Sequence, residues 1–320
     1  MTARHVKNAA ASVHQRLRNL AKRGPRPFDE LLQRYAIERF LYRLSASPHV
    51  DRFVLKGALM LAVWDAPMSR PTKDIDLLGQ TSNDVEALAA FFRDACLQEV
   101  DPDGLAFDPG SVRGAVIKEE ADYSGVRVLV DGGLGAARVR IQVDVGFGDV
   151  IVPGAEEVVY PTLLDMPAPR LRGYSRESTV AEKLEAAVKL DLRNSRMRDL
   201  YDLWFLSRRF QFVGLMLAEA VRRTFENRGT DLDPEPTTFR AEFVENSEKL
   251  IQWRSFVERT RTPEAPGDLS TIIEQVSAFL RPVLAALVEG RTFDAHWPPG
   301  GPWRERRKVV PAISDTWTGS

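Results

Sequence analysis

The spacing of apolar residues changes once along this 320-residue chain, and the change limits the folds that the chain can adopt. Up to about residue 175, short β-rich runs alternate with helical stretches, whereas from Ser178 onward every stretch has the period of an amphipathic helix. Alternating strands and helices are typical of a sheet covered by helices, and helices alone are typical of a bundle. We therefore expect an α+β fold, in which a mixed sheet with flanking helices is followed by an all-helical C-terminal bundle.

The same pattern divides the chain into three expected segments. Residues 1–50 form a helical arm, residues 51–175 an α/β core, and residues 176–320 a helical domain with a Pro- and Gly-rich tail. The stretch from Gly146 to Gly173 has no sustained period, which predicts a loop at the junction of core and helical domain. Strands are predicted over Phe53–Leu55, Asp74–Leu78, Val112–Ile117, Val126–Asp131 and Arg138–Val145. Helices are predicted over 28–44, 58–64, 83–97 with Asn83 or Ser82 as N-cap, 178–190, 196–206, 213–225, 239–257 and 269–287.

Composition narrows the class of protein. The 44 basic and 45 acidic side chains nearly cancel, so affinity for a polyanion has to come from local clusters of charge. The single Cys96 excludes an internal disulfide and disfavours a cysteine-based zinc site. No apolar run approaches the ~18 residues of a membrane span, and the N-terminus lacks the apolar core of a secretory signal. We therefore expect a cytoplasmic protein with no membrane partner.

Local clusters of positive charge do occur. The first 28 residues carry seven Lys and Arg side chains and no acid, a pattern typical either of a solvated first helix or of an arm that binds nucleic-acid phosphates. Arg222-Arg223 and the segment from Arg304 to Lys308 are two further candidates for contacts with a nucleic acid.

Two carboxylates stand close together on one predicted strand. Because side chains alternate along a strand, Asp74 and Asp76 project to one face while Ile75 and Leu77 enter the core. Two negative charges at this spacing repel each other, and a divalent cation bound between them relieves the repulsion. Taken alone, such a pair is also compatible with a solvated strand end.

The surrounding sequence favours the metal site. Lys56 and Gly57 lie where a strand turns into a helix that starts at Ala58, and glycine lets the backbone N–H groups approach a phosphate. A third carboxylate, Asp144, falls on the polar face of a strictly alternating strand and joins the pair if this strand lies beside theirs. Three carboxylates fit two Mg²⁺ ions, one beside an attacking hydroxyl and one beside a triphosphate.

The chain resembles the AbiEii/AbiGii (MenT-type) toxins of the DNA polymerase β-like nucleotidyltransferase superfamily. The resemblance covers residues 53–206, and its segments are Val54–Gly57, Arg70–Leu77, the strand of Asp144, Ser178–Ala186 and Asn194–Trp204. The last two segments are the more specific ones. Ala58 departs from the Ser or Gly usual at its position, which removes one hydroxyl from the phosphate turn.

What the resemblance implies is a larger site. Lys183 would reach the triphosphate, Asp202 or Asp199 would complete the centre, and Arg196 would bind the NTP. Plain helix-surface ion pairs remain an alternative for these residues: Lys183 with Glu182 or Glu185, Arg198 with Asp202, and Arg196 with Asp199. The resemblance also implies that Thr72, two residues before Asp74, is a site of silencing phosphorylation.

The implied activity is transfer of a nucleoside monophosphate from an NTP to RNA, the 3′ end of tRNA, which blocks translation and growth in a toxin-antitoxin or phage-defence system. A cognate antitoxin is the implied protein partner. Two alternatives stay open: an acceptor that is a protein or a small molecule, and a binding module that keeps the fold without the chemistry.

Overall fold

The computed structural model describes residues 8–65, 71–118, 124–260 and 264–305. The chain forms two compact units. The first unit comprises Met1–Glu182 with Ser255–Ala265, and the second comprises Lys183–Arg254 with Pro266–Ser320.

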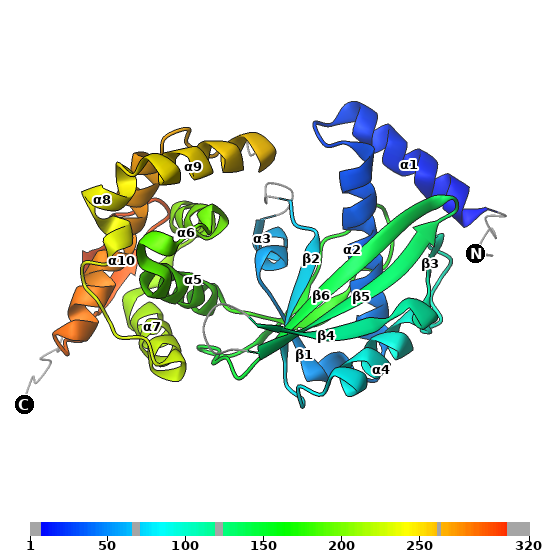
Figure 1. The fold of residues 1–320 in the computed structure, drawn as a ribbon, viewed down its shortest axis with the longest axis horizontal. Helices are drawn as coiled ribbons and strands as arrows, with labels where there is room; N and C mark the ends of the chain where they lie inside the picture. The colour runs from blue at the N-terminus through cyan, green and yellow to red at the C-terminus, as the bar shows by residue number, and fades with distance from the viewer. Residues whose placement is uncertain (1–7, 66–70, 119–123, 261–263, 306–320) are drawn as a thin grey trace, which may run out of the picture. The chain divides into compact units, whose positions relative to one another are not determined.

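An eight-stranded mixed sheet forms the first unit (Figure 1). The strand order is β3-β5-β6-β2-β1-β8-β7. β3 and β4 pair with the same edge of β5, β3 with its C-terminal part and β4 with its N-terminal part. The central strands β2 and β6 run parallel, while β1 is antiparallel to β2 and β5 is antiparallel to β6. The strands are β1 (Phe53–Lys56), β2 (Asp74–Gly79), β3 (Leu105–Phe107), β4 (Arg113–Lys118), β5 (Ser124–Leu134), β6 (Ala137–Phe147), β7 (Glu156–Val159) and β8 (Arg170–Gly173).

Helices cover one face of this sheet. They are α1 (Ala9–Arg23), α2 (Phe28–Ala46), α3 (Ala58–Asp65) and α4 (Val85–Cys96), with short 3-10 helices over Val50–Arg52 and Pro109–Ser111. In Figure 1, α2 runs behind β5 and β6, and it packs against β6, α4 and α1. Val13 and Leu17 of α1 belong to the same buried core as the strands, so the N-terminal helices are part of the first unit.

The two central strands alternate as the sequence predicts. Ile75 and Leu77 of β2 are buried, whereas Asp74 and Asp76 between them are partly exposed. In β6, Val143 and Val145 are buried on either side of the partly exposed Asp144. The apolar residues face the helices, so the acids lie on the opposite face of the sheet.

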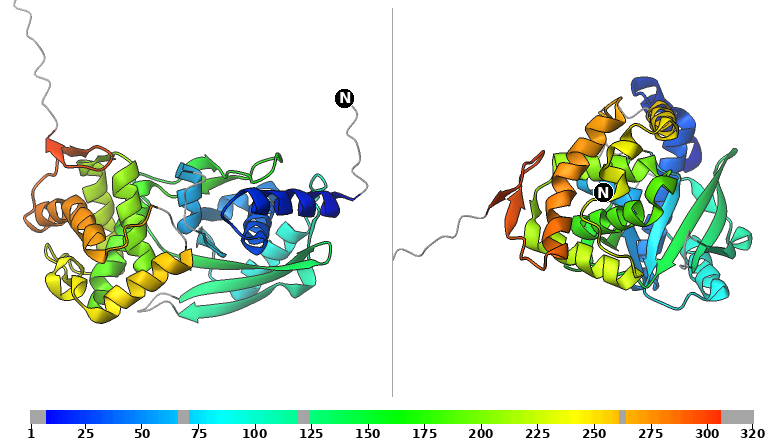
Figure 2. Two further views of the ribbon diagram at one scale, coloured as in Figure 1. Left: turned by 90° about the horizontal axis from the view of Figure 1, so that it is seen from above. Right: turned by 60° about the vertical axis from the view of Figure 1, so that its left-hand side comes forward.

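The second unit combines helices with a small sheet. Its helices are α6 (Met197–Arg209), α7 (Gly214–Arg228), α8 (Ala241–Val244) and α10 (Leu269–Val288), and its boundaries fall inside α5 (Arg176–Leu190) and α9 (Ser247–Thr260). Short 3-10 helices span Asp191–Arg193 and Thr237–Phe239. The three-stranded sheet has the order β11-β10-β9, with β9 (Phe212–Val213), β10 (Ala295–Trp297) and β11 (Arg304–Glu305). Figure 2 shows β10 and β11 at the red end of the colour range, close to α10.

Aromatic rings connect this small sheet to α10. Phe279 of α10 lies 4.9 Å from Trp297 and 5.8 Å from Trp303, measured between ring centroids. The indole of Trp297 donates a hydrogen bond to the carbonyl of Ser207, and that of Trp303 donates one to the carbonyl of Phe279. Trp297 therefore lies in the core of the second unit, and the partly buried Trp303 packs beside it.

In the part of the chain that the structure describes, one helix, α10, is long and apolar enough to cross a membrane by length and composition. It contains Glu274 and Arg281, and half of its most apolar window is buried inside the second unit, where it packs against α6 and α7. The core of a folded unit accounts for such a helix equally well.

The α+β class is confirmed, and four details differ from expectation. The stretch 146–173 is not a loop throughout, because β7 and β8 form there, and β8 pairs in parallel with β1. The C-terminal part is not all-helical, because it includes β9, β10 and β11. β8 pairs with β1 and β9 pairs with β10, and a local pattern does not reveal partners so distant in sequence. The expected helix 239–257 breaks before Ser247, and the N-cap of α4 is Asp84 rather than Asn83 or Ser82.

Candidate active site

Four charged residues form a row across neighbouring strands of the first unit. Lys56 of β1 is the cross-strand partner of Asp76 in β2, and Asp76 is the partner of Asp144 in β6. Asp144 in turn lies opposite Arg127 in β5. Because neighbouring strands are about 4.8 Å apart, this register brings two carboxylates together between two cations.

Asp74 extends this row along β2. It is the cross-strand partner of Gln142, whose side-chain amide donates a hydrogen bond of 3.1 Å to Asp144 Oδ2. Residues two apart on a strand share a face, so Asp74, Asp76 and Asp144 lie on the same face of the sheet. We call these three residues the carboxylate row. The structure thus brings together the three acids that the sequence singled out.

Gly57 provides the turn beside the carboxylate row. Its φ is +69°, a conformation that L side chains rarely adopt, and a Cβ atom on Gly57 would overlap with the carboxylate of Asp76. Helix α3 begins at the next residue, the buried Ala58, and the amide of Met60 donates to the carbonyl of Gly57. A glycine is therefore required here both for the backbone turn and for the close approach of Asp76.

Arg127 holds one member of the carboxylate row. Its Nε and Nη2 atoms donate to the two oxygens of Asp144, each at 2.8 Å. This hydrogen bonding raises the pKa of Arg127, and the charges of Asp74 and Asp76 raise it further. Arg127 therefore contacts Asp144, and its charge also interacts with those of Asp74 and Asp76. The alternation of its strand places Arg127 on the polar face, but only the register of β5 against β6 pairs it with Asp144.

Lys56 pairs with two acids that the sequence did not single out. Its ammonium lies 2.7 Å from Asp149 Oδ2 and 3.5 Å from Glu182 Oε2. It also lies 5.6 Å from the centre of the Tyr174 ring. Asp149 follows β6 and Glu182 belongs to α5, so both come from segments that the fold, and not the local sequence, brings to Lys56.

A second group of expected residues lies in the second unit. The ammonium of Lys183 in α5 is 2.6 Å from Asp199 Oδ1 and 2.8 Å from Asp202 Oδ2, both in α6. The side chain of Asp202 is fully buried, and those of Lys183 and Asp199 are each 11% exposed. Arg196 is the N-cap residue of α6. The structure therefore joins Lys183 to both candidate acids, and Glu185 pairs with Arg228 and Thr230.

A family model decides the classification. The model of the nucleotidyl transferase AbiEii toxin of type IV toxin-antitoxin systems matches residues 39–282, about three quarters of the chain. This chain belongs to the AbiEii family. It is accordingly a toxin-type nucleotidyltransferase, and the nucleotide substrate of AbiEii enzymes is an NTP. The family match covers β1, β2, β5, β6, α5 and α6, which carry the carboxylate row, Lys56, Arg127, Lys183, Asp199 and Asp202.

Similar solved structures come from Helicobacter pylori. A candidate nucleotidyltransferase is 15% identical with a TM-score of 0.46, covering 82% of this chain and 98% of its own. The protein JHP933 is 14% identical with a TM-score of 0.45, covering 82% of this chain and 94% of its own. Among curated proteins, none matches this AbiEii chain.

The carboxylate row of this AbiEii chain offers oxygen ligands of the kind that Mg²⁺ binds. Within residues 8–65, 71–118, 124–260 and 264–305, no three His, Cys, Asp or Glu side chains converge as a metal-binding group. Both oxygens of Asp144 accept hydrogen bonds from the guanidinium of Arg127, so this carboxylate is oriented towards β5. Asp74, Asp76 and Asp144 have the ligand chemistry that a divalent cation needs, and they share one face of the sheet.

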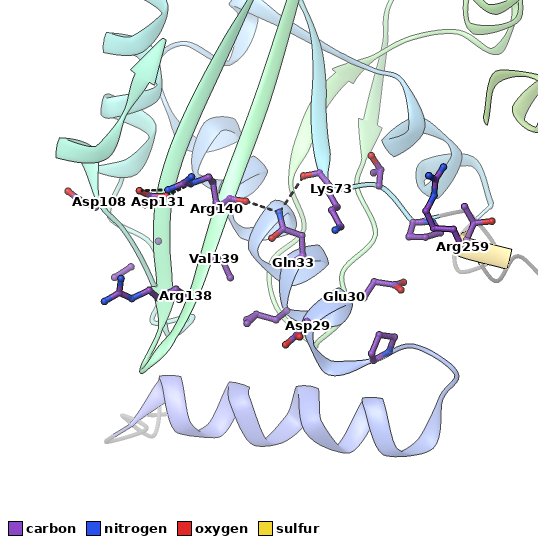
Figure 3. A pocket seen from close by; sticks show the side chains of 17 residues that line it. Asp29, Glu30, Gln33, Lys73, Asp108, Asp131, Arg138, Val139, Arg140 and Arg259 are labelled. Carbon is purple, nitrogen blue, oxygen red and sulfur yellow. Dashed lines mark hydrogen bonds and ion pairs between the residues drawn. The ribbon is translucent and has the colours of Figure 1, made fainter. Parts of the chain in front are cut away.

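A pocket lies next to the first residues of β2 (Figure 3). The amide of Gln33 spans part of it and donates to the carbonyls of Lys73 at 3.3 Å and Arg140 at 2.9 Å. Thr72 lines the same pocket, and its hydroxyl lies 3.4 Å from both the backbone N and the backbone O of Asp74. Its phosphorylation stays a prediction.

Only some of the basic residues predicted to contact a nucleic acid lie in the described part of the chain. Arg4, Lys7 and the residues 306–308 lie outside the described residues. Arg222 has its guanidinium held by Glu219 at 2.8 Å and by Glu226 at 2.6 Å. The charge of Arg222 is therefore largely offset within α7.

Proposed function

We propose that this AbiEii chain is a metal-dependent nucleotidyltransferase that transfers a nucleoside monophosphate from an NTP to an RNA hydroxyl, at the 3′ end of tRNA. The observation that carries the proposal is the carboxylate row beside Gly57. It combines three acids on one face of a sheet with the start of helix α3, whose N-terminal amides attract an anion. Modification of the acceptor end would block translation and growth.

The reaction that fits this arrangement is a displacement at phosphorus. The hydroxyl oxygen of the acceptor bonds to the α-phosphorus of the NTP, the bond from this phosphorus to the bridging oxygen breaks, and pyrophosphate leaves. The hydroxyl proton passes to a carboxylate of the row and then to solvent.

The residues have separate tasks in this reaction. Gly57 turns the chain from β1 into α3, whose N-terminal amides attract an anion. Asp74, Asp76 and Asp144 would hold two Mg²⁺ ions, which neutralise phosphate charge and favour ionisation of the acceptor hydroxyl. Lys56 and the group of Lys183, Arg196, Asp199 and Asp202 remain predicted members of the site.

The acceptor is tested by incubating the purified chain with Mg²⁺, one labelled NTP at a time, and either total tRNA or tRNA lacking its terminal 3′ hydroxyl. We expect label on intact tRNA only. We also expect transfer to fall steeply as salt rises, because RNA binding releases counterions. Label on protein, or transfer that salt does not affect, would instead indicate another acceptor.

The biological role is tested in a bacterial host. Expression of the wild-type chain should stop growth, and Asp76→Ala should restore it. Growth arrest that persists with Asp76→Ala would mean that the chain acts without this chemistry. An antitoxin is the expected partner, because the family belongs to type IV toxin-antitoxin systems.

A further inference from the structure

Arg127 holds the carboxylate of Asp144, the cross-strand partner of Asp76. Both donor atoms of Arg127 are 2.8 Å from their acceptors, and both oxygens of Asp144 are used. The side chain of Asp144 is 15% exposed and that of Arg127 is 40% exposed, so the pair is open to solvent and to a cation.

The position of Arg127 also affects the other two acids. Its pKa is raised first by the hydrogen bonds to Asp144 and then by the charges of Asp74 and Asp76. Three carboxylates on one sheet face repel one another when nothing positive lies between them. Arg127 is a cation of the chain that reduces this repulsion.

We propose that Arg127 is a positioning residue that competes with a divalent cation for Asp144. This inference rests on the proposed metal site. In the metal-free protein, the guanidinium orients Asp144 and offsets the charge of the carboxylate row. Oδ2 of Asp144 already accepts hydrogen bonds from both Arg127 and Gln142, and Oδ1 accepts one from Arg127. A cation that takes Asp144 as a ligand therefore competes with the guanidinium for the lone pairs of the carboxylate and is repelled by its positive charge.

Two consequences follow from this competition. Arg127 lowers the affinity for the cation, because part of the binding energy is used to break its contacts with Asp144. It also keeps the metal-free site folded in a conformation close to the one that binds the cation. Removal of Arg127 should therefore tighten cation binding and weaken the metal-free fold.

The chain contains a matched control pair on the same two strands. Arg140 of β6 is the cross-strand partner of Asp131 in β5, and its Nε and Nη2 donate to the two oxygens of Asp131 at 2.6 and 3.3 Å. This pair has the same chemistry but does not include a member of the carboxylate row. Its loss should leave cation binding unchanged.

The test is a calorimetric titration of the full-length chain with Mn²⁺, without nucleotide, on the wild type, Asp76→Asn, Arg127→Gln, Arg127→Lys and Arg140→Gln. We expect the dissociation constant to fall about fivefold in Arg127→Gln, the size expected for loss of a partly exposed pair. Arg127→Lys retains the charge without the two-point hydrogen bonding, so its dissociation constant should lie between those of the wild type and Arg127→Gln. Arg140→Gln should match the wild type.

Thermal melting gives a second readout that does not depend on activity. Without metal, Arg127→Gln should melt below the wild type, and saturating Mn²⁺ should raise its melting temperature by more than that of the wild type. If Arg127→Gln does not fold, the milder Arg127→Lys carries both measurements.

The possible failures are distinguishable. If Mn²⁺ binds the wild type and Asp76→Asn abolishes binding, while Arg127→Gln binds no more tightly, the competition is overturned and the proposed metal site stands. If neither wild type nor variants bind Mn²⁺, the metal site is overturned and the competition with it.

Discussion

The first unit carries two sets of charged side chains that differ in burial and in balance of charge. Beneath the sheet, Glu38, Arg39 and Arg43 of α2 lie with Asp103, and all four are at most 5% exposed. On the open face, the carboxylate row has three acids around Arg127, and its members are partly exposed. The buried set has equal numbers of acids and bases, whereas the open set has an excess of acid that a bound cation can offset.

The contacts of Asp103 show how the buried set is stabilised. Its oxygens accept hydrogen bonds from Arg39 at 3.0 Å, from Arg43 at 2.6 and 3.0 Å, and from the amide of Leu105 at 3.1 Å. Burial by itself would raise the pKa of Asp103, but the contacts with Arg43 and Arg39 hold it below its usual value. We infer that the buried set serves stability and that the open set serves a ligand.

Asp103→Asn should have the largest effect on stability. It removes the charge that Arg39 and Arg43 share and leaves the buried Arg43 without its acid, so the free energy of unfolding should fall by about 3 kcal/mol. Urea denaturation at pH 7 measures this, with Asp131→Asn as the exposed control, for which we expect little change. A similar loss in both variants would contradict the assigned difference in burial.

Glu38→Gln should have the next largest effect, and only at high pH. Burial raises the pKa of Glu38 to about 7, so its neutral form is the one that the fold favours. The pKa of this carboxyl group is near 4.5 in the unfolded chain and higher in the folded one. The contribution of Glu38 to the free energy of unfolding is therefore complete below pH 4.5 and is lost as the pH rises through 7. At pH 8, Glu38→Gln should therefore gain about 2 kcal/mol over the wild type, with little difference at pH 4.5.

The amide of Leu163 donates to Glu38 at 2.7 Å, and a glutamine oxygen can accept the same hydrogen bond. Urea denaturation at both pH values checks this prediction, with Glu86→Gln on exposed α4 as the control. Equal stabilisation of Glu38→Gln at the two pH values would show that the charge of Glu38 is not the cause.

Asp76→Asn should have the smallest effect on stability. It relieves repulsion within the carboxylate row, so in metal-free buffer the free energy of unfolding should stay within about 1 kcal/mol of the wild type or rise. Thermal and urea unfolding measure it. A loss as large as that of Asp103→Asn would mean that the carboxylate row is a structural element after all.

The sequence predicted one set far better than the other. Asp74, Asp76 and Asp144 stand on strands with strict alternation, so the face that each occupies could be predicted. Arg127, Asp149 and Glu182 could not, because their partners depend on strand register and on loops that fold back from distant segments. The parallel pairing of β8 with β1 was missed for the same reason.

The apolar spacing of α2 did not predict that its charged residues are buried. The apolar spacing predicted one buried face, yet Glu38, Arg39 and Arg43 are buried as well. Arg39 and Arg43 are tolerated because Asp103, at least 60 residues away, provides the opposite charge, and Glu38 accepts a hydrogen bond from the amide of Leu163. The spacing of apolar residues predicts which face of a helix is buried by apolar contacts. It does not predict that charged residues on the same helix will be buried against an acid from a distant segment.

Nucleotide transfer by Asp76→Asn tests the central claim most directly. The wild type, Asp76→Asn and Asp131→Asn would each be incubated with Mg²⁺, total tRNA and the four labelled NTPs, after their folded state has been checked by circular dichroism. We expect Asp131→Asn to retain transfer and Asp76→Asn to lose at least about a thousandfold, equivalent to ~4 kcal/mol of barrier. Equal transfer by Asp76→Asn and the wild type would contradict the claim that the carboxylate row is the catalytic centre.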